Sequence, residues 1–125
     1  MGLSIVLSIR PPYARAILEG KKTFEYRRSI PRKEIDKILI YEAAPASMVV
    51  ASTRIKQIIC LPLDKLWLRT SQGSGISKEF FDRYFDGKEA GYAYELEDVH
   101  EFEIPLPLSH FGLAKAPQSF AYYSG

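Results

Sequence analysis

The sequence predicts an α+β fold, a small and mostly antiparallel β-barrel flanked by two or three short helices. Three observations lead to this class. About six segments have the alternating or apolar pattern of strands, whereas few segments have helical spacing. The expected strands and helices do not alternate along the chain as they do in parallel α/β folds. The 125 residues also fit one domain, which we expect to span 1–125.

The N-terminal half contains one expected helix, between its first two strands. Pro11 and Pro12 end the first strand, and proline suits the first turn of a helix. Apolar side chains at helical spacing extend this helix over 13–19, and Gly20 is placed to end it in a left-handed conformation. The expected strands of this half are 4–9, 23–28, 37–41 and 48–61.

The C-terminal half begins with a short expected helix over 62–68. The composition of 69–75, which contains two glycines and two serines, predicts a flexible loop. Ser77 is a good N-cap for a helix over 78–85. The remaining expected elements are strands at 91–97 and 101–106 and a closing tail at 117–123.

The composition excludes several classes of protein. A single cysteine, Cys60, excludes an internal disulfide, and its apolar neighbours predict a buried side chain. His100 and His110 lie outside any metal-ligand spacing, so we expect no metal site and no cofactor. No apolar run approaches the roughly 18 residues of a membrane span, and the apolar N-terminus has no preceding basic region. We therefore expect a cytoplasmic protein with no membrane partner.

The net charge of +2 conceals an asymmetry along the chain. Segment 10–37 has nine Lys and Arg against four Asp and Glu, whereas segment 79–103 has two against nine. If the fold separates these segments, the basic one can attract phosphates. The alternative is that neighbouring strands interleave the two charges.

The densest candidate site is segment 20–28, which holds four cations, one carboxylate and the hydroxyl of Thr23. Lys22 and Arg27 can bind phosphate or a base edge, and Glu25 can pair with Arg27 or accept from an exocyclic amine. The alternative is a solvated basic edge strand. On strict alternation Lys22 faces away from Thr23, Glu25 and Arg27, so a bend after Gly20 is needed to bring it back.

Aromatic and loop residues form weaker candidates. Trp67, Tyr41 and Tyr26 lie near the expected cleft, where an aromatic ring can stack on a base for about 1–3 kcal/mol. Trp67 can instead cap the core. Ser47 can bind a ligand or form a turn, and residues 118–119 can orient the basic segment or belong to a pinned tail.

A family signature is visible in the N-terminal half: LSIRPP at 7–12 and ILEGKKT at 17–23, with Ala14, Glu25 and Arg27. It resembles the opening of the ASCH domain, a family of the PUA-like superfamily. The resemblance continues along the chain through Tyr41, APAS at 44–47, Trp67, GIS at 75–77, the 80–85 helix and PQSF at 117–120.

The resemblance implies a helix-flanked barrel with a cleft lined by the Gly-Lys-Lys-Thr segment. It also implies RNA or a nucleotide or nucleoside as partner, in RNA processing or in the regulation of translation or transcription. We expect the cleft contacts to come from Arg10, Lys21, Lys22, Thr23, Glu25, Arg27, Tyr41, Ser47 and Trp67.

The same resemblance implies an alternative, an enzyme. Some ASCH proteins are amidohydrolases that act on N4-acetylcytidine, and another cleaves RNA. Of the amidohydrolase lysine, threonine and glutamate, the lysine falls on Lys22 and the threonine on Glu25, while the glutamate falls within 68–75, which has no carboxylate. An enzyme of either kind would use Lys22 as base or nucleophile, with its pKa lowered by burial or nearby cations, and Glu25 as proton shuttle.

Overall fold

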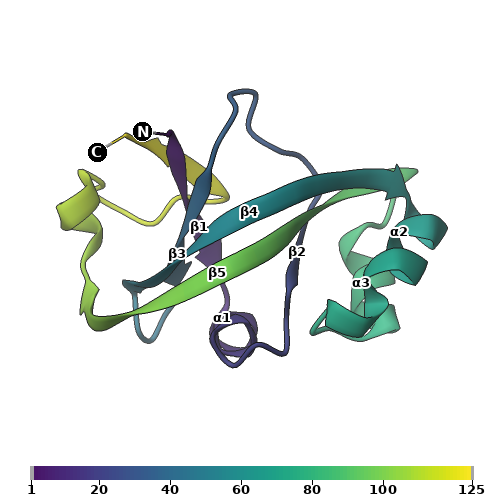
Figure 1. Ribbon diagram of the computed structural model, residues 1–125, viewed down its shortest axis with the longest axis horizontal. Helices are drawn as coiled ribbons and strands as arrows, with labels where there is room; N and C mark the ends of the chain where they lie inside the picture. The colour runs from purple at the N-terminus through teal and green to yellow at the C-terminus, as the bar shows by residue number, and fades with distance from the viewer. Residues whose placement is uncertain (1, 125) are drawn as a thin grey trace.

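The computed structural model describes residues 2–124, and over this range six strands form one curved sheet (Figure 1). The sheet order is β2-β5-β4-β3-β1-β6. β1 and β3 are parallel, and the other neighbouring pairs are antiparallel. The strands are β1 (Ser4–Ile9), β2 (Phe24–Arg27), β3 (Lys37–Glu42), β4 (Met48–Pro62), β5 (Ala90–Leu106) and β6 (Phe120–Tyr123).

This architecture confirms the α+β class and the mostly antiparallel pairing. The expected barrel does not close, because within residues 2–124 the hydrogen-bonded order ends at β2 on one side and β6 on the other. The sheet curves so that β1 and β2 approach each other without pairing. We call this unpaired junction between β1 and β2 the seam.

Three short α-helices accompany the sheet within the described range: α1 (Pro11–Leu18), α2 (Leu63–Thr70) and α3 (Lys78–Tyr84). They match the expected helices apart from small shifts of their ends. α2 and α3 lie together at one end of β4 and β5, and β6 lies toward the other end of the molecule (Figure 1). None of the helices within residues 2–124 is long and apolar enough to cross a membrane.

The C-terminal half differs from the expectation in two ways. The segments expected as separate strands at 91–97 and 101–106 belong to one long strand, β5, in which Asp98 has a φ of 52° and the pairing register with β4 shifts. Such an irregularity bends a strand without ending it. The expected tail instead contains β6, which pairs with β1.

The core fills both faces of the central strands. Inside the curve, Ile5 and Leu7 of β1 and Ile38 and Ile40 of β3 pack with Ile17 of α1. Alternate residues of β1 and β3 pack on the other face together with Val49 of β4, and side chains from the C-terminal segment cover them. The buried residues on this face are Val6, Leu39, Tyr41 and Val49. A central sheet buried on both faces explains the unbroken apolar runs in the sequence.

A separate cluster attaches α2 and α3 to the far end of β4 and β5. It contains Phe81 of α3 and Phe85, which follows the helix as its C-cap. The Phe81 ring meets the Tyr26 ring edge to face, at 5.1 Å between centroids. Here β4 has one covered face, so Ile59 is buried while Cys60 is exposed. The expectation that Cys60 is buried is therefore wrong, because alternation turns it away from this cluster.

The N-terminus of α3 is capped as the sequence predicts, because the Ser77 hydroxyl accepts a hydrogen bond from the Phe80 N–H at 3.1 Å. We expect Ser77→Ala to lower the free energy of unfolding by about 1 kcal/mol, measured by urea denaturation. Ser77→Asp is the control, since a carboxylate retains the cap. Equal stability of the alanine variant and the wild type would contradict the capping role.

Candidate functional site

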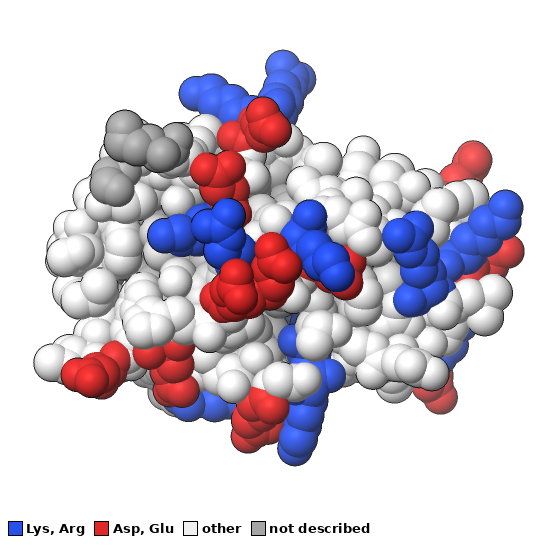
Figure 2. Space-filling view, viewed as in Figure 1, with Lys and Arg blue, Asp and Glu red and all other residues white. Residues whose placement is uncertain are grey.

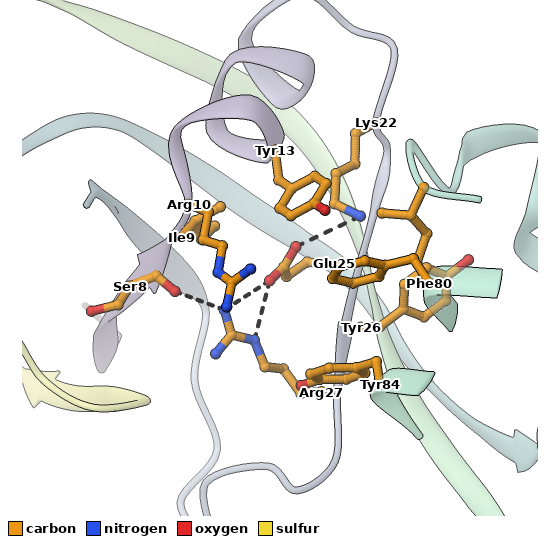
Figure 3. Close-up of a pocket in the computed structure, with 11 residues that line it drawn as sticks. Ser8, Ile9, Arg10, Tyr13, Lys22, Glu25, Tyr26, Arg27, Phe80 and Tyr84 are labelled. Atoms are coloured by element: carbon orange, nitrogen blue, oxygen red, sulfur yellow. Dashed lines mark hydrogen bonds and ion pairs between the residues drawn. The ribbon is translucent and has the colours of Figure 1, made fainter. Parts of the chain in front are cut away.

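A pocket of about 200 Å³ lies at the seam (Figure 3). β1 contributes Ser8 and Ile9, and β2 contributes Glu25, Tyr26 and Arg27. The remaining walls come from the ends of α1 and from the α3 region: Arg10, Tyr13, Lys22, Ile76, Phe80 and Tyr84. The pocket therefore lies where β1 and β2 approach each other without backbone pairing.

The end of α1 places Lys22 in this pocket. Gly20 has a φ of 79°, its N–H donates to the Ile17 carbonyl, and the Lys21 N–H donates to the Ala16 carbonyl. This is a Schellman motif, which needs the left-handed residue that glycine supplies. Because the chain turns here before β2 begins at Phe24, Lys22 does not obey strand alternation. Its Nζ lies 3.8 Å from Glu25 Oε1.

The segment around Ser74 packs directly against Lys22. The Thr23 N–H donates to the Gly73 carbonyl at 2.9 Å, and Lys22 Nζ donates to the Ser74 carbonyl at 2.6 Å. Gly75 has a φ of 66°, and a Cβ at this position would lie 2.7 Å from Lys22 Cβ. The loop expected to be flexible is thus a packed segment that includes a turn of 3₁₀ helix, and Gly75 permits the close approach.

The Lys22 ammonium is enclosed by rings and one carbonyl. Lys22 is 3% exposed, and its Nζ lies 5.1 Å from the centroid of the Tyr26 ring and 5.8 Å from that of Tyr13. Burial lowers the pKa of Lys22, the nearby Glu25 carboxylate opposes this effect, and Arg27 adds to it. This lysine is therefore easier to deprotonate than a solvated one.

Arg27 bridges the seam. Its Nε and Nη2 donate to Glu25 Oε2 at 3.1 and 2.7 Å, which is the pair expected from their shared strand face. Nη2 also donates to the Ser8 carbonyl at 2.9 Å. The guanidinium thus connects β2 to β1 where no backbone pairing does so.

The C-terminal segment fixes the β1 side of this bridge. The Ser8 N–H donates to the Ser119 carbonyl at 3.2 Å, and the Ser8 hydroxyl donates to the Pro117 carbonyl at 2.7 Å. The backbone of the tail thereby holds the residue whose carbonyl receives Arg27. These contacts come from backbone carbonyls, so an orienting role for the polar side chains of 118–119 stays a prediction, and Phe120 packs against the core as the pinned-tail alternative expects.

Four aromatic side chains line the pocket: Tyr13, Tyr26, Phe80 and Tyr84. The rings of Tyr13 and Phe80 are 5.3 Å apart between centroids. The Thr70 hydroxyl donates to the Leu66 carbonyl, so the Tyr26 hydroxyl is the donor in its 2.6 Å bond to Thr70. Burial raises the pKa of both Tyr26 and Tyr84, so both rings stay neutral.

Four of the nine expected cleft contacts line this pocket, Arg10, Lys22, Glu25 and Arg27, and the aromatic candidate Tyr26 lines it as well. The sequence analysis did not include Ser8, Tyr13, Phe80 and Tyr84. Phe80 and Tyr84 are four residues apart, so their shared helix face was a usable signal. Which element that face would meet depends on tertiary packing.

The other five expected contacts lie outside this pocket, and their part in binding stays a prediction. Lys21 is exposed on the outer side of the Schellman turn, with Nζ 3.4 Å from Glu19. Tyr41 lies on the opposite face of β3, and the Trp67 ring packs on Phe81 at 5.0 Å. Thr23 is exposed beside Gly73, and Ser47 lies in the turn before β4 with a φ of 53°.

On the face that carries β4 and β5, carboxylates of the acidic segment 79–103 lie beside cations of β4, which is outside the basic segment 10–37. Figure 2 shows Asp and Glu gathered near its centre with Lys and Arg close by. Arg54 of β4 pairs in register with Glu97 of β5, and Lys56 Nζ lies 4.0 Å from Glu95. The two segments themselves are neighbours where β2 pairs with β5, so the fold does not place them on separate faces there. Across residues 2–124, no three His, Cys, Asp or Glu side chains gather in a group that could hold a metal ion.

The ASCH domain family model matches residues 7–106, and the chain belongs to this family. This chain is 32% identical over 122 residues to an ASCH domain-containing ribonuclease of Zymomonas mobilis. The matched region covers 94% of this chain and 82% of that protein. This confirms the resemblance on which the PUA-like fold was predicted.

A solved structure supports the same assignment. The crystal structure of ASCH from Zymomonas mobilis superposes with a TM-score of 0.88 at 29% identity, covering 97% of this chain and 87% of that one. The chain also resembles the large ribosomal subunit protein uL22 of Ureaplasma parvum, at 24% identity over 120 residues. The matched region covers 95% of this chain, and the chain spans 39% of the length of that relative.

The contact between Gly75 and Lys22 can be tested with alanine. Gly75 and Gly87 both have a left-handed backbone, but the space around a Cβ at Gly87 is empty to 4 Å. Both alanine variants incur the backbone strain, about 1 kcal/mol, and Gly75→Ala adds a clash with Lys22. We expect Gly75→Ala to be the more destabilising by at least about 1 kcal/mol in urea denaturation. Equal losses would show that the loop does not depend on this approach.

The lowered pKa of Lys22 predicts a pH-dependent stability. At pH values between the lowered pKa of Lys22 in the folded protein and its unfolded pKa of 10.5, the unfolded chain binds more protons than the folded one. The stability of the wild type therefore rises with pH in this range. Lys22→Met lacks this contribution. We expect the wild type to gain stability relative to Lys22→Met between about pH 7 and about pH 10, measured by urea denaturation.

Lys65→Met, which removes an exposed lysine, controls for the loss of one charge. A difference between wild type and Lys22→Met that stays constant with pH would contradict the burial of a charged ammonium.

Proposed function

We propose that this protein binds RNA by inserting a single unstacked nucleotide into the seam pocket. The observation that carries the proposal is the convergence of Arg10, Lys22 and Arg27 beside an aromatic wall in one cavity. An RNA-related role is also supported by membership of the ASCH family and by the relative that is named a ribonuclease.

The size of the pocket supports a single nucleotide. A volume of about 200 Å³ corresponds to about seven water molecules at ~30 Å³ each, which suits one planar base and excludes a duplex. Recognition of single-stranded RNA commonly takes an unstacked base onto aromatic side chains. Phe80, Tyr84 and Tyr13 offer such a surface here.

The polar groups of the pocket have two separate roles in this proposal, attraction of phosphate and recognition of a base edge. The cations attract the phosphate backbone, which makes affinity dependent on salt. Glu25 Oε2 accepts both bonds from Arg27, while Oε1 is available to a base edge such as an exocyclic amine. In this proposal the Arg27–Glu25 pair holds both groups in one orientation.

A second candidate function is RNA cleavage, and a specific observation favours it. Lys22 combines a lowered pKa with a carboxylate 3.8 Å away, and the relative that covers 94% of the chain is named a ribonuclease. A neutral Lys22 can take the proton of an attacking hydroxyl, and Glu25, at 3.8 Å, can receive that proton from Lys22 and pass it to the leaving group.

The nucleoside amidohydrolase alternative has less support than RNA cleavage. Of the three catalytic groups that the family resemblance implies, the pocket keeps Lys22. Glu25 stands at the threonine position, and the 68–75 segment supplies the Ser74 carbonyl to Lys22 and has no carboxylate.

The binding proposal predicts a strong effect of Lys22. We expect Lys22→Met to weaken the binding of single-stranded RNA of about ten nucleotides by about tenfold or more, because a buried charged donor is lost. Fluorescence anisotropy at several salt concentrations measures the affinity and its salt dependence. Lys65→Met, which removes an equal charge from an exposed site, should change the affinity little.

Undiminished affinity in Lys22→Met, or the absence of wild-type binding to RNA of any base composition, would refute RNA binding at this pocket. Incubation of the same RNA with the wild type, followed by gel electrophoresis, tests the cleavage alternative. Intact RNA after prolonged incubation would exclude that alternative for these substrates.

A further inference from the structure

The seam pocket has an excess of positive charge. Its lining contains three cations, Arg10, Lys22 and Arg27, and one carboxylate, Glu25. Lys22 and Arg27 are largely buried, whereas Arg10 is exposed at the pocket, and a buried charge without a full partner is unfavourable. The occupant that relieves this imbalance is an anion.

Lys22 has hydrogen-bonding capacity that its protein neighbours do not use. An ammonium has three N–H donors, and among the described residues Lys22 Nζ makes one hydrogen bond, to the Ser74 carbonyl. Glu25 Oε1, at 3.8 Å, is beyond hydrogen-bond distance. A side chain that is 3% exposed thus directs unused donors into the cavity (Figure 3).

Arg27 and Arg10 have unused donors as well. The Arg27 bonds to Glu25 and Ser8 come from Nε and Nη2, which leaves Nη1 without a partner among the described residues. Arg10 is exposed, and its guanidinium makes no hydrogen bond or ion pair within residues 2–124. Guanidinium groups with free N–H pairs suit the oxygens of a phosphate.

We propose that the seam pocket binds the terminal phosphate of a nucleotide, with the attached base or ribose against Tyr13, Phe80 and Tyr84. This inference rests on the proposed function and deepens it. A phosphate monoester carries about −1.5 to −2 charges at neutral pH, which matches three cations and one carboxylate. An internal phosphodiester carries one negative charge, and a nucleoside carries none.

The phosphate monoester can come from a free nucleotide or from the phosphorylated end of an RNA strand. Both sources present the same group to Lys22, Arg27 and Arg10. Glu25 neutralises part of the charge and holds Arg27 in place through Oε2, so it does not remove the preference for a dianion.

The test uses one short RNA sequence in three forms: a 5′-phosphate, a 3′-phosphate, or hydroxyl groups at both ends. Fluorescence anisotropy gives the affinity of each form. We expect at least about tenfold tighter binding with a phosphate at one end, because charge-assisted bonds to buried donors are the strong ones.

Competition experiments distinguish the two sources. A nucleoside monophosphate should displace the phosphorylated RNA, whereas the matching nucleoside at the same concentration should not. Inorganic phosphate should compete more weakly than the monophosphate, because it lacks the group that contacts the aromatic rings. Displacement by the nucleoside as effective as by the monophosphate overturns the proposal.

Two variants locate the phosphate. Lys22→Met should remove the preference for the phosphorylated end. Arg10→Gln changes an exposed side chain, so it keeps the proposal testable even if Lys22→Met fails to fold, and it should reduce the preference by about threefold or more. Lys65→Gln should leave the preference unchanged. The proposal is overturned if the preference for phosphorylated RNA is undiminished in Arg10→Gln. It is also overturned if the preference persists in both Lys22→Met and Arg10→Gln.

Failure of this inference is distinguishable from failure of the proposed function. If all three RNA forms bind equally and Lys22→Met weakens them equally, the phosphate site is refuted and RNA binding stands. If the monophosphate binds and none of the RNA forms does, RNA binding is refuted and the phosphate site stands.

Discussion

The Arg27 guanidinium makes the contact on which the rest of the site depends. It joins β2 to the Ser8 carbonyl of β1 across the seam, and on the way it fixes the Glu25 carboxylate through two hydrogen bonds. β1 already pairs with β3 on one edge and β6 on the other, so no backbone ladder joins it to β2. A side-chain bridge joins the two strands and keeps a cavity of about 200 Å³ between them. A charge-assisted bridge is also stronger than a neutral one, which suits a junction with so few contacts.

The seam is maintained from three parts of the chain. The Schellman motif after α1 supplies Lys22, the segment around Ser74 receives its ammonium, and the C-terminal backbone holds Ser8. These contacts join residues 52 and 109 positions apart in the sequence. The enclosed lysine has an energetic cost, since burial disfavours its charged form. Polar groups held at such a cost are typical of sites that bind ligands or perform chemistry.

Local signals predicted the N-terminal part of this site, and long-range ones were needed for the rest. Gly20 marked the end of α1, and alternation placed Glu25 and Arg27 on one face of β2, as found. Strand β6 was not predicted, because its partner β1 lies at the other end of the chain. Phe80 and Tyr84 were not expected at the site for the same reason: helical spacing identifies a face but not the element that it meets. Trp67 was a candidate by residue type, although its ring packs against Phe81.

The contact between Gly75 and the aliphatic stem of Lys22 joins two positions that a sequence comparison would treat separately. Any side chain larger than hydrogen at position 75 requires a different aliphatic stem at position 22. The effects of substitutions at the two positions on stability are therefore not additive. The residues at the two positions are then expected to change together during evolution. Within the family, we expect relatives that keep a lysine at the end of the first helix also to keep a glycine in the distant loop. Those that lose one should tend to lose the other, which makes the pair a means of sorting ASCH domains by pocket type.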